Sequence, residues 1–491
     1  MTYDQRAISV TAGERVSFHT VKLTPKWPRF HRNSDRSILI NQRMIEDTPI
    51  SGPPEGGGLA RALSWIEMLL LPFLAASGLL GQSLSPNESA MLRAIDDAAP
   101  YSIGLLEKIV NINSGSFNPA GVKSVSTVVE GELRALGFET RLIAMDALKR
   151  GPHLTAQRKG SRPGKPVLLI GHMDTVFEPS SPFQRFVRNG ATATGPGVND
   201  MKGGLVVMIS ALKALHQAGL LDGASIGIFL TGDEEAPGNP LATARGGLIE
   251  AGKSAKAALC FESGRRIGGS DYISTARRGF VGWELRVEGV AGHSGRVFSD
   301  GLGHGAIFEL SRVINEFHKQ LREPNLTFNV GLALGGADVK ADANGAASAN
   351  GKSNIVAGEA LARGDLRALS PEQAGRAKDK MYAIAAKGLP GTKTELKFED
   401  GYPAMPPAAG NKRLLAALNA ASKRAGIPEA AELDPMERGA GDISFIAPYV
   451  DSLTGLGAIG SGAHAAGESI DLESLPRTIK RAAVLIHSLT R

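Results

Sequence analysis

The chain has 491 residues, of which 42% are hydrophobic and 21% are charged, and these ordinary values indicate a globular protein of two or three domains. The net charge is +6, but the lysine and arginine residues are scattered and no basic run with interleaved aromatic residues occurs, which argues against nucleic-acid binding. Cys260 is the only cysteine of the sequence, so neither an intramolecular disulfide nor a cluster of thiolate metal ligands can form.

The first 82 residues differ in composition from the rest. Residues 1–60 lack sustained hydrophobic periodicity and include a Gly- and Pro-rich stretch, so we expect them to be unstructured or absent from the mature protein. Residues 61–82 contain an uncharged apolar run, 68–80 (MLLLPFLAASGLL), which is too short for a stable membrane span of roughly 20 residues but suits the core of a signal peptide. A signal peptide would need a translation start closer to this run, for example at Met44, and a short surface helix is the alternative. Export and a cytoplasmic location therefore both stay open.

Helix-like and strand-like segments alternate from about residue 86 onward. Apolar positions at helical spacing occur in residues 88–112, 119–136 and 201–218. Short apolar runs typical of buried strands occur in residues 166–170, 225–230 and 257–261. This alternation predicts an α/β sandwich with a mostly parallel sheet.

The pattern changes near residue 277. Residues 279–288 alternate like a half-buried strand, and the pattern continues with a helix, two strands and a second helix. We therefore expect an inserted α+β domain at residues 277–389. The flanking residues 86–276 and 390–491 would form one domain, because the alternating α/β pattern resumes from Thr392.

Acidic and histidine side chains follow the predicted strands of this α/β domain or, for Asp200, precede the predicted helix at 201–218. They are His172, Asp174, Asp200, Glu234, Glu235, Glu262 and, near the C-terminus, His464. Because the ligand crevice of an open α/β sheet lies at the carboxyl ends of its strands, we expect these side chains to converge. Converging carboxylates would repel one another unless a divalent cation compensates them, and histidine combined with carboxylate suits zinc. The alternative is a series of separate, solvated strand ends, which the recurrence of the pattern argues against.

Five motifs occur in order along the chain: GHMDTV (171–176), GPGVNDMKGG (195–204), TGDEEAPG (231–238), CFESG (260–264) and SGAHAAGESI (461–470). Together they resemble the dinuclear zinc metallopeptidases of the glutamate carboxypeptidase, acetylornithine deacetylase and aminoacylase family, and the pattern is most similar to bacterial glutamate carboxypeptidase. The resemblance covers nearly all of residues 86–491. It implies a zinc-exopeptidase-like sandwich with an inserted domain that serves as a lid and in dimerisation.

The resemblance implies two Zn²⁺ ions per chain, for which Co²⁺ or Mn²⁺ could substitute. Asp200 would bridge the two ions. His172 and Glu262 would complete one metal site, and Glu235 and His464 would complete the other.

The resemblance also implies roles around the metals. Asp174 would orient His172, and Glu234 would act as the general base and acid that moves a proton from the attacking water to the leaving amine. His293, in the motif VAGHSG (290–295), would stabilise the oxyanion and can enter the partner's active site in a homodimer formed by the inserted domain. An ordinary surface histidine is the alternative for His293.

A further motif, SNIVAGEALARGDLRAL (353–369), contains Asn354 and Arg367, which resemble the family's contacts to a substrate carboxylate. Arginine suits this role because its planar guanidinium binds a carboxylate through two parallel hydrogen bonds. Pairing of Arg367 with Asp365 is the alternative. One segment departs from the family pattern: residues 236–245 (APGNPLATAR) are longer and richer in proline than the usual glycine turn, so we expect a reshaped substrate pocket.

We therefore expect zinc-dependent hydrolysis of an amide bond that releases a C-terminal amino acid from a small peptide or an N-acyl amino acid. An N-acyl amino acid deacylase of the same family is one alternative. A non-catalytic metal-binding relative is a second, against which the presence of Glu234 argues. A two-metal phosphoesterase is a third, and it would need more Lys and Arg near the site than the motifs supply.

Overall fold

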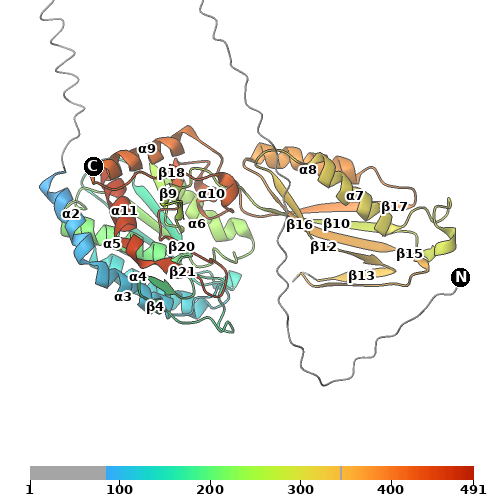
Figure 1. The fold of residues 1–491 in the computed structure, drawn as a ribbon, viewed down its shortest axis with the longest axis horizontal. Coiled ribbons are helices and arrows are strands. Elements are labelled where there is room, and N and C mark those ends of the chain that lie inside the picture. The colour runs from blue at the N-terminus through green and yellow to red at the C-terminus, as the bar shows by residue number, and fades with distance from the viewer. Residues whose placement is uncertain (1–83, 343–344) are drawn as a thin grey trace, which may run out of the picture. The chain divides into compact units, whose positions relative to one another are not determined.

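A computed structural model describes residues 84–342 and 345–491, so the predictions for residues 1–60 and 61–82 lie outside the described residues. The described chain forms an α/β domain and a second domain built on a separate antiparallel sheet (Figure 1). Among the described helices, none combines the length and the apolar character that crossing a membrane requires.

A six-stranded sheet forms the centre of the α/β domain. Its strands, in spatial order, are β1 (Glu139–Ile143), β2 (His153–Arg158), β6 (Ile226–Thr231), β3 (Val167–His172), β7 (Ala257–Cys260) and β19 (Ser452–Thr454). The strands β6, β3, β7 and β19 are parallel neighbours, whereas β1 and β2 join the sheet in antiparallel fashion. The expected α/β fold with a mostly parallel sheet is thus confirmed.

Alternate residues of the central strand β3 face two different cores. Val167 and Leu169 belong to the larger core, while Leu168 and Ile170 belong to a smaller core on the opposite face of the sheet. The larger core is lined by α2 (Pro86–Asp97), α3 (Ala99–Val110), α4 (Pro119–Ala135), α5 (Lys202–Gln217), α9 (Ala409–Arg424) and α11 (Leu475–Thr490), and the smaller core by α6 (Leu241–Ser254) and α10 (Ile443–Ile446). Because helices cover both faces, every residue of β3 is buried, which explains the uninterrupted apolar run in the sequence.

Helix α5 lies close to the end of the sheet because glycines occupy its first turn. A Cβ atom at Gly204 would lie 1.9 Å from the carbonyl oxygen of Phe261, so only glycine allows the helix to approach the segment that follows β7. This approach places Asp200, two residues before the helix, within reach of Glu262, one residue after Phe261.

Two smaller sheets complete the α/β domain. Their strands are β20 (Gly460–Ser461), β21 (Ser469–Asp471), β5 (Thr192–Thr194) and β4 (Val187–Asn189) in one sheet, and β18 (Ala431–Glu432), β9 (Ser270–Ile273) and β8 (Arg265–Ile267) in the other. Single turns of 3-10 helix lie at Asp146–Leu148, Ser294–Arg296, Pro435–Glu437 and Leu472–Ser474. Because β21 pairs with β5, the segment that carries His464 is attached to the segment that leads to Asp200.

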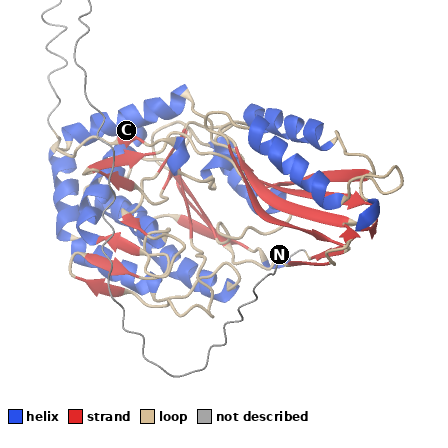
Figure 2. Cartoon of the chain, turned by 45° about the vertical axis from the view of Figure 1, so that its right-hand side comes forward, coloured by secondary structure: helices blue, strands red, loops and turns tan. Residues whose placement is uncertain are grey.

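The second domain is an antiparallel sheet with two helices packed on one face (Figure 2). Its strands, in spatial order, are β12 (Thr327–Gly336), β16 (Glu359–Arg367), β10 (Val281–Gly289) and β17 (Thr392–Asp400), and its helices are α7 (Ala306–Gln320) and α8 (Pro371–Ala385). Two short strand pairs accompany the sheet: β11 (Gly292–His293) with β15 (Ile355–Val356), and β13 (Asp338–Ala341) with β14 (Ala347–Asn350). The core between sheet and helices contains Trp283 and Phe317, whose rings meet edge to face at 5.9 Å.

One strand of this sheet lies beyond the boundary expected at residue 389. The sequence pattern assigns residues 390–491 to the α/β domain, but β17 pairs along its whole length with β10 and so belongs to the antiparallel sheet. Along β17, polar residues alternate with Leu396 and Phe398, which pack on the core of the second domain. The expected end of the inserted domain is corrected accordingly.

Two segments that connect the domains lie side by side. Arg277 and Met405 exchange two backbone hydrogen bonds of 2.9 Å, and the N–H of Phe280 donates to the carbonyl oxygen of Tyr402 at 2.8 Å. The chain therefore leaves the α/β domain and returns to it through one hydrogen-bonded pair of segments, residues 277–280 and 401–405.

Candidate active site

The side chains expected to converge do so at the carboxyl ends of the parallel strands. His172 is the last residue of β3, Glu234 and Glu235 follow β6, and Glu262 follows β7. His464 reaches the same place from the turn between β20 and β21. The five residues predicted as metal ligands form two overlapping groups that share Asp200.

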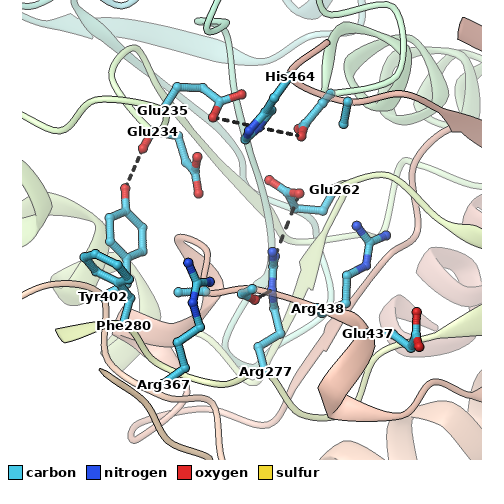
Figure 3. A pocket seen from close by; sticks show the side chains of 14 residues that line it. Glu234, Glu235, Glu262, Arg277, Phe280, Arg367, Tyr402, Glu437, Arg438 and His464 are labelled. Carbon is cyan, nitrogen blue, oxygen red and sulfur yellow. Dashed lines mark hydrogen bonds and ion pairs between the residues drawn. The ribbon is translucent and has the colours of Figure 1, made fainter. Parts of the chain in front are cut away.

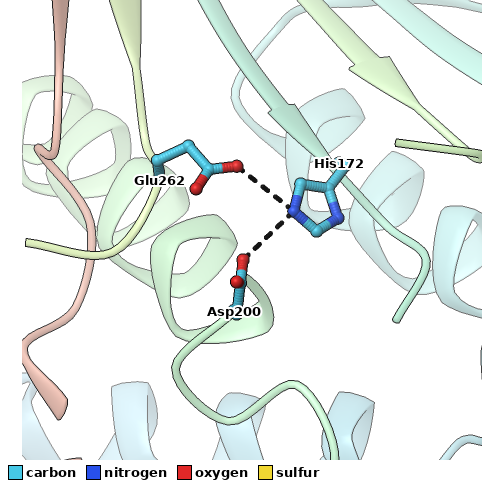
Figure 4. Close-up of side chains that lie close together, drawn as sticks. All are labelled: His172, Asp200 and Glu262. Carbon is cyan, nitrogen blue, oxygen red and sulfur yellow. Dashed lines mark hydrogen bonds and ion pairs between the residues drawn. The ribbon is translucent and has the colours of Figure 1, made fainter. Parts of the chain in front are cut away.

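The first group consists of His172, Asp200 and Glu262 (Figure 4). The Nε2 atom of His172 lies 3.3 Å from Asp200 Oδ1 and 3.3 Å from Glu262 Oε1. One imidazole nitrogen and two carboxylate oxygens directed at one point are donors that a divalent cation such as zinc accepts.

The second group consists of Asp200, Glu235 and His464. The Nε2 atom of His464 lies 3.4 Å from Asp200 Oδ2 and 3.1 Å from Glu235 Oε2. Asp200 thus faces each group with a different carboxylate oxygen. Glu235 Oε1 is buried and has no hydrogen-bond partner among the described residues, which is the state expected of an atom whose partner is a metal ion. The residues present therefore fit a pair of cations.

Asp174 lies behind the first group and is fully buried. Its Oδ1 atom lies 3.4 Å from His172 Nδ1, and its two oxygens accept backbone hydrogen bonds from Glu234 at 2.9 Å and from Glu235 at 3.0 Å. The hydroxyl of Ser116 donates to it at 2.6 Å. Asp174 therefore holds the imidazole from one side and the Glu234–Glu235 bend from the other.

The carboxylates and imidazoles strongly perturb one another's protonation. Burial opposes protonation of His172, but its hydrogen bonds to Asp174, Asp200 and Glu262 outweigh burial and raise its pKa. Hydrogen bonds to Asp200 and Glu235 raise the pKa of His464 to about 11.

Burial also raises the pKa of both glutamates. The pKa of Glu235 rises to about 7, and that of Glu234 rises well above its ordinary value, with repulsion from Glu262 as a further cause. A bound cation would relieve this repulsion.

Glu468 supports the site and carries no role in the sequence prediction. Its buried carboxylate accepts hydrogen bonds from the backbone N–H groups of Gly197 at 3.2 Å, Asn199 at 2.7 Å and Asp200 at 2.8 Å. Burial raises the pKa of Glu468 to about 7, although these hydrogen bonds oppose the rise. The only signal in the sequence is its position four residues after His464.

A cavity of about 350 Å³ opens beside the two groups (Figure 3). Four of the five metal-ligand candidates line it, all except His172, together with Glu234. Its other lining side chains include Arg277, Phe280, Arg367, Tyr402 and Arg438. Arg367 is thus one of the residues that line the cavity. Its Nε atom also donates to Asp365 at 2.9 Å, so the pairing considered as the alternative is present as well.

Sequence reasoning missed the other two arginines of the cavity. Arg277 donates from Nε to the carbonyl oxygen of Gly439 at 2.6 Å, and its Nη1 lies 3.8 Å from Glu262 Oε2. Arg438 binds the backbone and side chain of Ser263. Neither arginine lies in a ligand motif, so only the folded chain brings them together.

His293 and Asn354 lie outside the cavity of their own chain. They belong to the second domain, where β11 pairs with β15 and the N–H of Ser294 donates to the carbonyl oxygen of Asn354 at 3.0 Å. Both side chains are exposed. The structure therefore places the two residues beside each other, but not with Glu234 or Arg367.

The proline-rich segment 236–245 folds back against the bend that carries Glu234. The N–H of Gly238 donates to Asp233 Oδ2 at 2.8 Å, and α6 begins at Leu241. None of the residues 236–245 lines the cavity, so this segment does not form the cavity wall.

A parallel sheet whose strand ends gather two groups of histidine and carboxylate ligands beside an arginine-lined cavity defines a metal-dependent hydrolase. Residues 168–488 match Peptidase family M20/M25/M40, a family of metal-dependent peptidases. The chain is also 30% identical over 430 residues to carboxypeptidase G2 from Pseudomonas sp. (strain RS-16). The aligned residues cover 85% of this chain and 96% of that protein. The chain belongs to Peptidase family M20/M25/M40, and the family resemblance drawn from the five motifs is confirmed.

One further relative shares part of the sequence, and two solved structures share the fold. Succinyl-diaminopimelate desuccinylase from Leptothrix cholodnii is 30% identical over 208 residues, or 39% of this chain and 51% of that protein. Aminopeptidase PepT from Bacillus cereus has a similar fold, with a TM-score of 0.65 at 18% identity over 80% of this chain and 98% of that one. The YXEP protein of Bacillus subtilis, a dinuclear metal-binding peptidase of the M20 family, has a TM-score of 0.54 at 16% identity over 80% and 99% of the two chains.

Proposed function

We propose that this protein is a dinuclear zinc carboxypeptidase that hydrolyses an amide bond and releases a C-terminal amino acid from a small peptide or an N-acyl amino acid. The observation that carries the proposal is the position of Asp200, whose two oxygens face two separate histidine–carboxylate groups beside a cavity that contains Arg367. The similarity to carboxypeptidase G2 over most of both chains supports the same activity.

In this proposal the metal ligands are His172, Asp200 and Glu262 for one ion and Asp200, Glu235 and His464 for the other. The dinuclear metal centre of the YXEP relative supports the number of ions. When bound, the two ions supply an acidified water molecule and a Lewis acid for the substrate carbonyl.

Glu234 is the proposed general base and acid. It lies next to Glu235, lines the cavity and is held by Asp174 through its backbone N–H. Glu234 accepts a proton from the attacking water and returns it to the leaving amine, so that one carboxyl group serves both steps. Asp174 keeps the His172 imidazole oriented by its position at Nδ1.

Arg367 is the proposed contact for the α-carboxylate of the substrate. Its guanidinium lies over the ring of Phe280, with 5.2 Å from its central carbon to the ring centroid, and 35% of its side chain is exposed. Only part of its donor capacity is used by Asp365. The remaining N–H groups can bind a free carboxylate in the cavity.

We further propose a homodimer formed by the second domain, in which His293 and Asn354 of one chain complete the site of the other. The exposed large apolar side chains of that domain include Phe298, Ile307 and Phe308, and the rings of Phe298 and Phe308 lie 5.6 Å apart. Clustered apolar exposure of this kind is typical of a protein–protein interface. The exposure of His293 outside its own cavity agrees with a role across the dimer.

Hydrolysis assays with zinc-loaded and metal-free protein test the proposal. The substrates would be N-acyl amino acids and dipeptides, each as the free acid and as the C-terminal amide. We expect zinc-dependent release of the C-terminal amino acid from the free acids. Zinc-loaded protein that cleaves none of the substrates would instead point to a non-catalytic metal-binding relative.

A second candidate function is removal of an acyl group from an N-acyl amino acid. The similarity to succinyl-diaminopimelate desuccinylase over about half of that protein favours it. Both activities break an amide bond, so they differ only in what lies on the carbonyl side. Preference for short N-acyl groups over dipeptides with the same C-terminal residue would identify the deacylase.

A further inference from the structure

Tyr402 connects the link between the two domains to the bend that carries Glu234. It lies two residues after β17, in the segment through which the chain returns to the α/β domain. Its hydroxyl donates a hydrogen bond to the backbone carbonyl oxygen of Glu234 at 2.7 Å, across the cavity wall (Figure 3). The same hydroxyl accepts a hydrogen bond from Arg245 Nη2 at 2.8 Å.

Arg245 gives this hydroxyl a fixed position. The arginine is fully buried, and it donates from Nη1 to Asp233 Oδ1 at 2.6 Å and from Nε to Asp442 Oδ1 at 2.7 Å. Asp442 is held in turn by the hydroxyl of Thr231 at 2.6 Å. The charge-assisted hydrogen bonds to Asp233 and Asp442 fix the plane and the orientation of the guanidinium. The direction of the N–H group that donates to Tyr402 is therefore fixed as well.

The position of the Glu234 side chain depends on its backbone. Among the described residues, no group donates a hydrogen bond to the Glu234 carboxylate. Its peptide groups are held instead: the N–H donates to Asp174 Oδ1 at 2.9 Å, and the carbonyl accepts from Tyr402. We expect loss of either bond to shift the peptide groups of Glu234 and, with them, its carboxylate.

We propose that Tyr402 is a positioning residue that fixes Glu234 for proton transfer, through the hydrogen bond of its hydroxyl to the Glu234 carbonyl. The proposal rests on the proposed function of Glu234 as the general base. Tyr402 belongs to the paired segments that join the domains, since its carbonyl oxygen accepts the hydrogen bond from Phe280. The alignment of the base is therefore tied to the conformation of this connection.

The first test is Tyr402→Phe, which removes the hydroxyl and keeps the ring that lies 5.0 Å from the ring of Phe445. Tyr382→Phe, on the exposed face of α8, is the matched control. We expect kcat of Tyr402→Phe to fall about 10- to 100-fold, because a misplacement of about 1 Å costs that much in rate. KM and zinc content should stay as in the unmodified protein, and Tyr382→Phe should resemble it in all three measurements.

A double variant distinguishes positioning from an independent role. If Tyr402 acts only through Glu234, Tyr402→Phe combined with Glu234→Gln should be no slower than Glu234→Gln alone. The inference would be overturned if the kcat losses of the two single variants multiplied in the double variant. It would also be overturned if Tyr402→Phe changed KM without changing kcat, or if its turnover were normal. Each of these outcomes leaves Glu234 as the base. Full turnover of Glu234→Gln would overturn the proposed function, and the inference with it.

Discussion

Glu468 accepts a hydrogen bond of 2.8 Å from the backbone N–H of Asp200, although 268 positions of sequence separate the two residues. The same carboxylate binds two further N–H groups of the Asp200 loop, those of Gly197 and Asn199. Since Glu468 lies four residues after His464, one buried side chain joins the two segments that supply the second metal-ligand group.

Replacing Glu468 should therefore weaken metal binding without touching a ligand. Glu468→Gln keeps the size of the side chain but turns an NH₂ group toward backbone N–H donors, so part of this support is lost. We expect about 10- to 100-fold weaker zinc affinity, as for other residues that orient ligands. Zinc titration would measure it, with Glu473→Gln on the exposed side of the neighbouring turn as the control. Unchanged affinity would show that the loop holds its shape alone.

Asp200→Ala should lose both metal ions, because Asp200 alone belongs to both groups. Glu262→Ala and His464→Ala should each lose mainly one ion, and they serve as the comparison. Elemental analysis after dialysis against a fixed low zinc concentration measures the difference. Retention of one tightly bound ion by Asp200→Ala would contradict the shared-ligand arrangement.

Glu234→Gln should leave the metal content unchanged and lower kcat by about 10² to 10⁴, since the amide cannot accept the proton. The measurement is steady-state kinetics on a substrate that the unmodified protein cleaves. Glu437→Gln, which also lines the cavity but lies in neither ligand group, is the control. A similar loss of kcat in both variants would mean that turnover depends on the charge of the cavity and not on Glu234 as a base.

Arg367→Ala should abolish the preference for free acids over amides. Arg367 keeps Asp365 as a partner when an amide is bound, so only its hydrogen bonds to the substrate are lost, at about 1.5 to 3 kcal/mol, and the unmodified protein should prefer the acid by about 10- to 100-fold in kcat/KM. Arg367→Lys should restore the preference only partly, because a point charge cannot form two parallel hydrogen bonds. Arg376→Ala, on the surface of α8, provides the control. Equal rates of the unmodified protein on acid and amide would assign Arg367 another role.

Phe308→Glu should separate the proposed dimer into monomers, because it places a charge on the exposed apolar cluster of the second domain. Light scattering measures the molecular mass in solution. If His293 acts across the dimer, activity should be lost when the dimer dissociates. Tyr449→Glu introduces the same charge at an exposed aromatic residue of the other domain. In a further test, mixed His293→Ala and Glu234→Gln chains should recover part of the activity. A fully active monomer would exclude a role for the partner's histidine.

The convergence of the acidic and histidine side chains that follow β3, β6 and β7 could be predicted from the sequence, because each of these strands is an apolar run and the ends of parallel neighbours meet. His172 after β3 and Glu262 after β7 illustrate this, since β3 and β7 are direct neighbours. The division into two ligand groups, and the place of His464 in one of them, came instead from the family resemblance.

The remaining features depend on contacts that a linear pattern does not contain. β17 alternates like any half-buried strand, and only its pairing with β10 assigns it to the second domain. The hydroxyl of Tyr402 meets Arg245 across 157 positions and Glu234 across 168. Arg277 and Arg438 likewise become neighbours of Glu262 only when loops from distant parts of the chain meet.

The paired segments that join the domains also bear on how the substrate selectivity of such an enzyme can be altered by mutation. All proposed metal ligands come from outside residues 277–405, whereas Arg277, Phe280, Arg367 and Tyr402 all lie within this range and form part of the cavity wall. Mutations in the insertion and its two connections can therefore alter which molecule is accepted while the hydrolytic centre stays intact. Exchange of this one continuous segment between relatives should transfer selectivity as a unit.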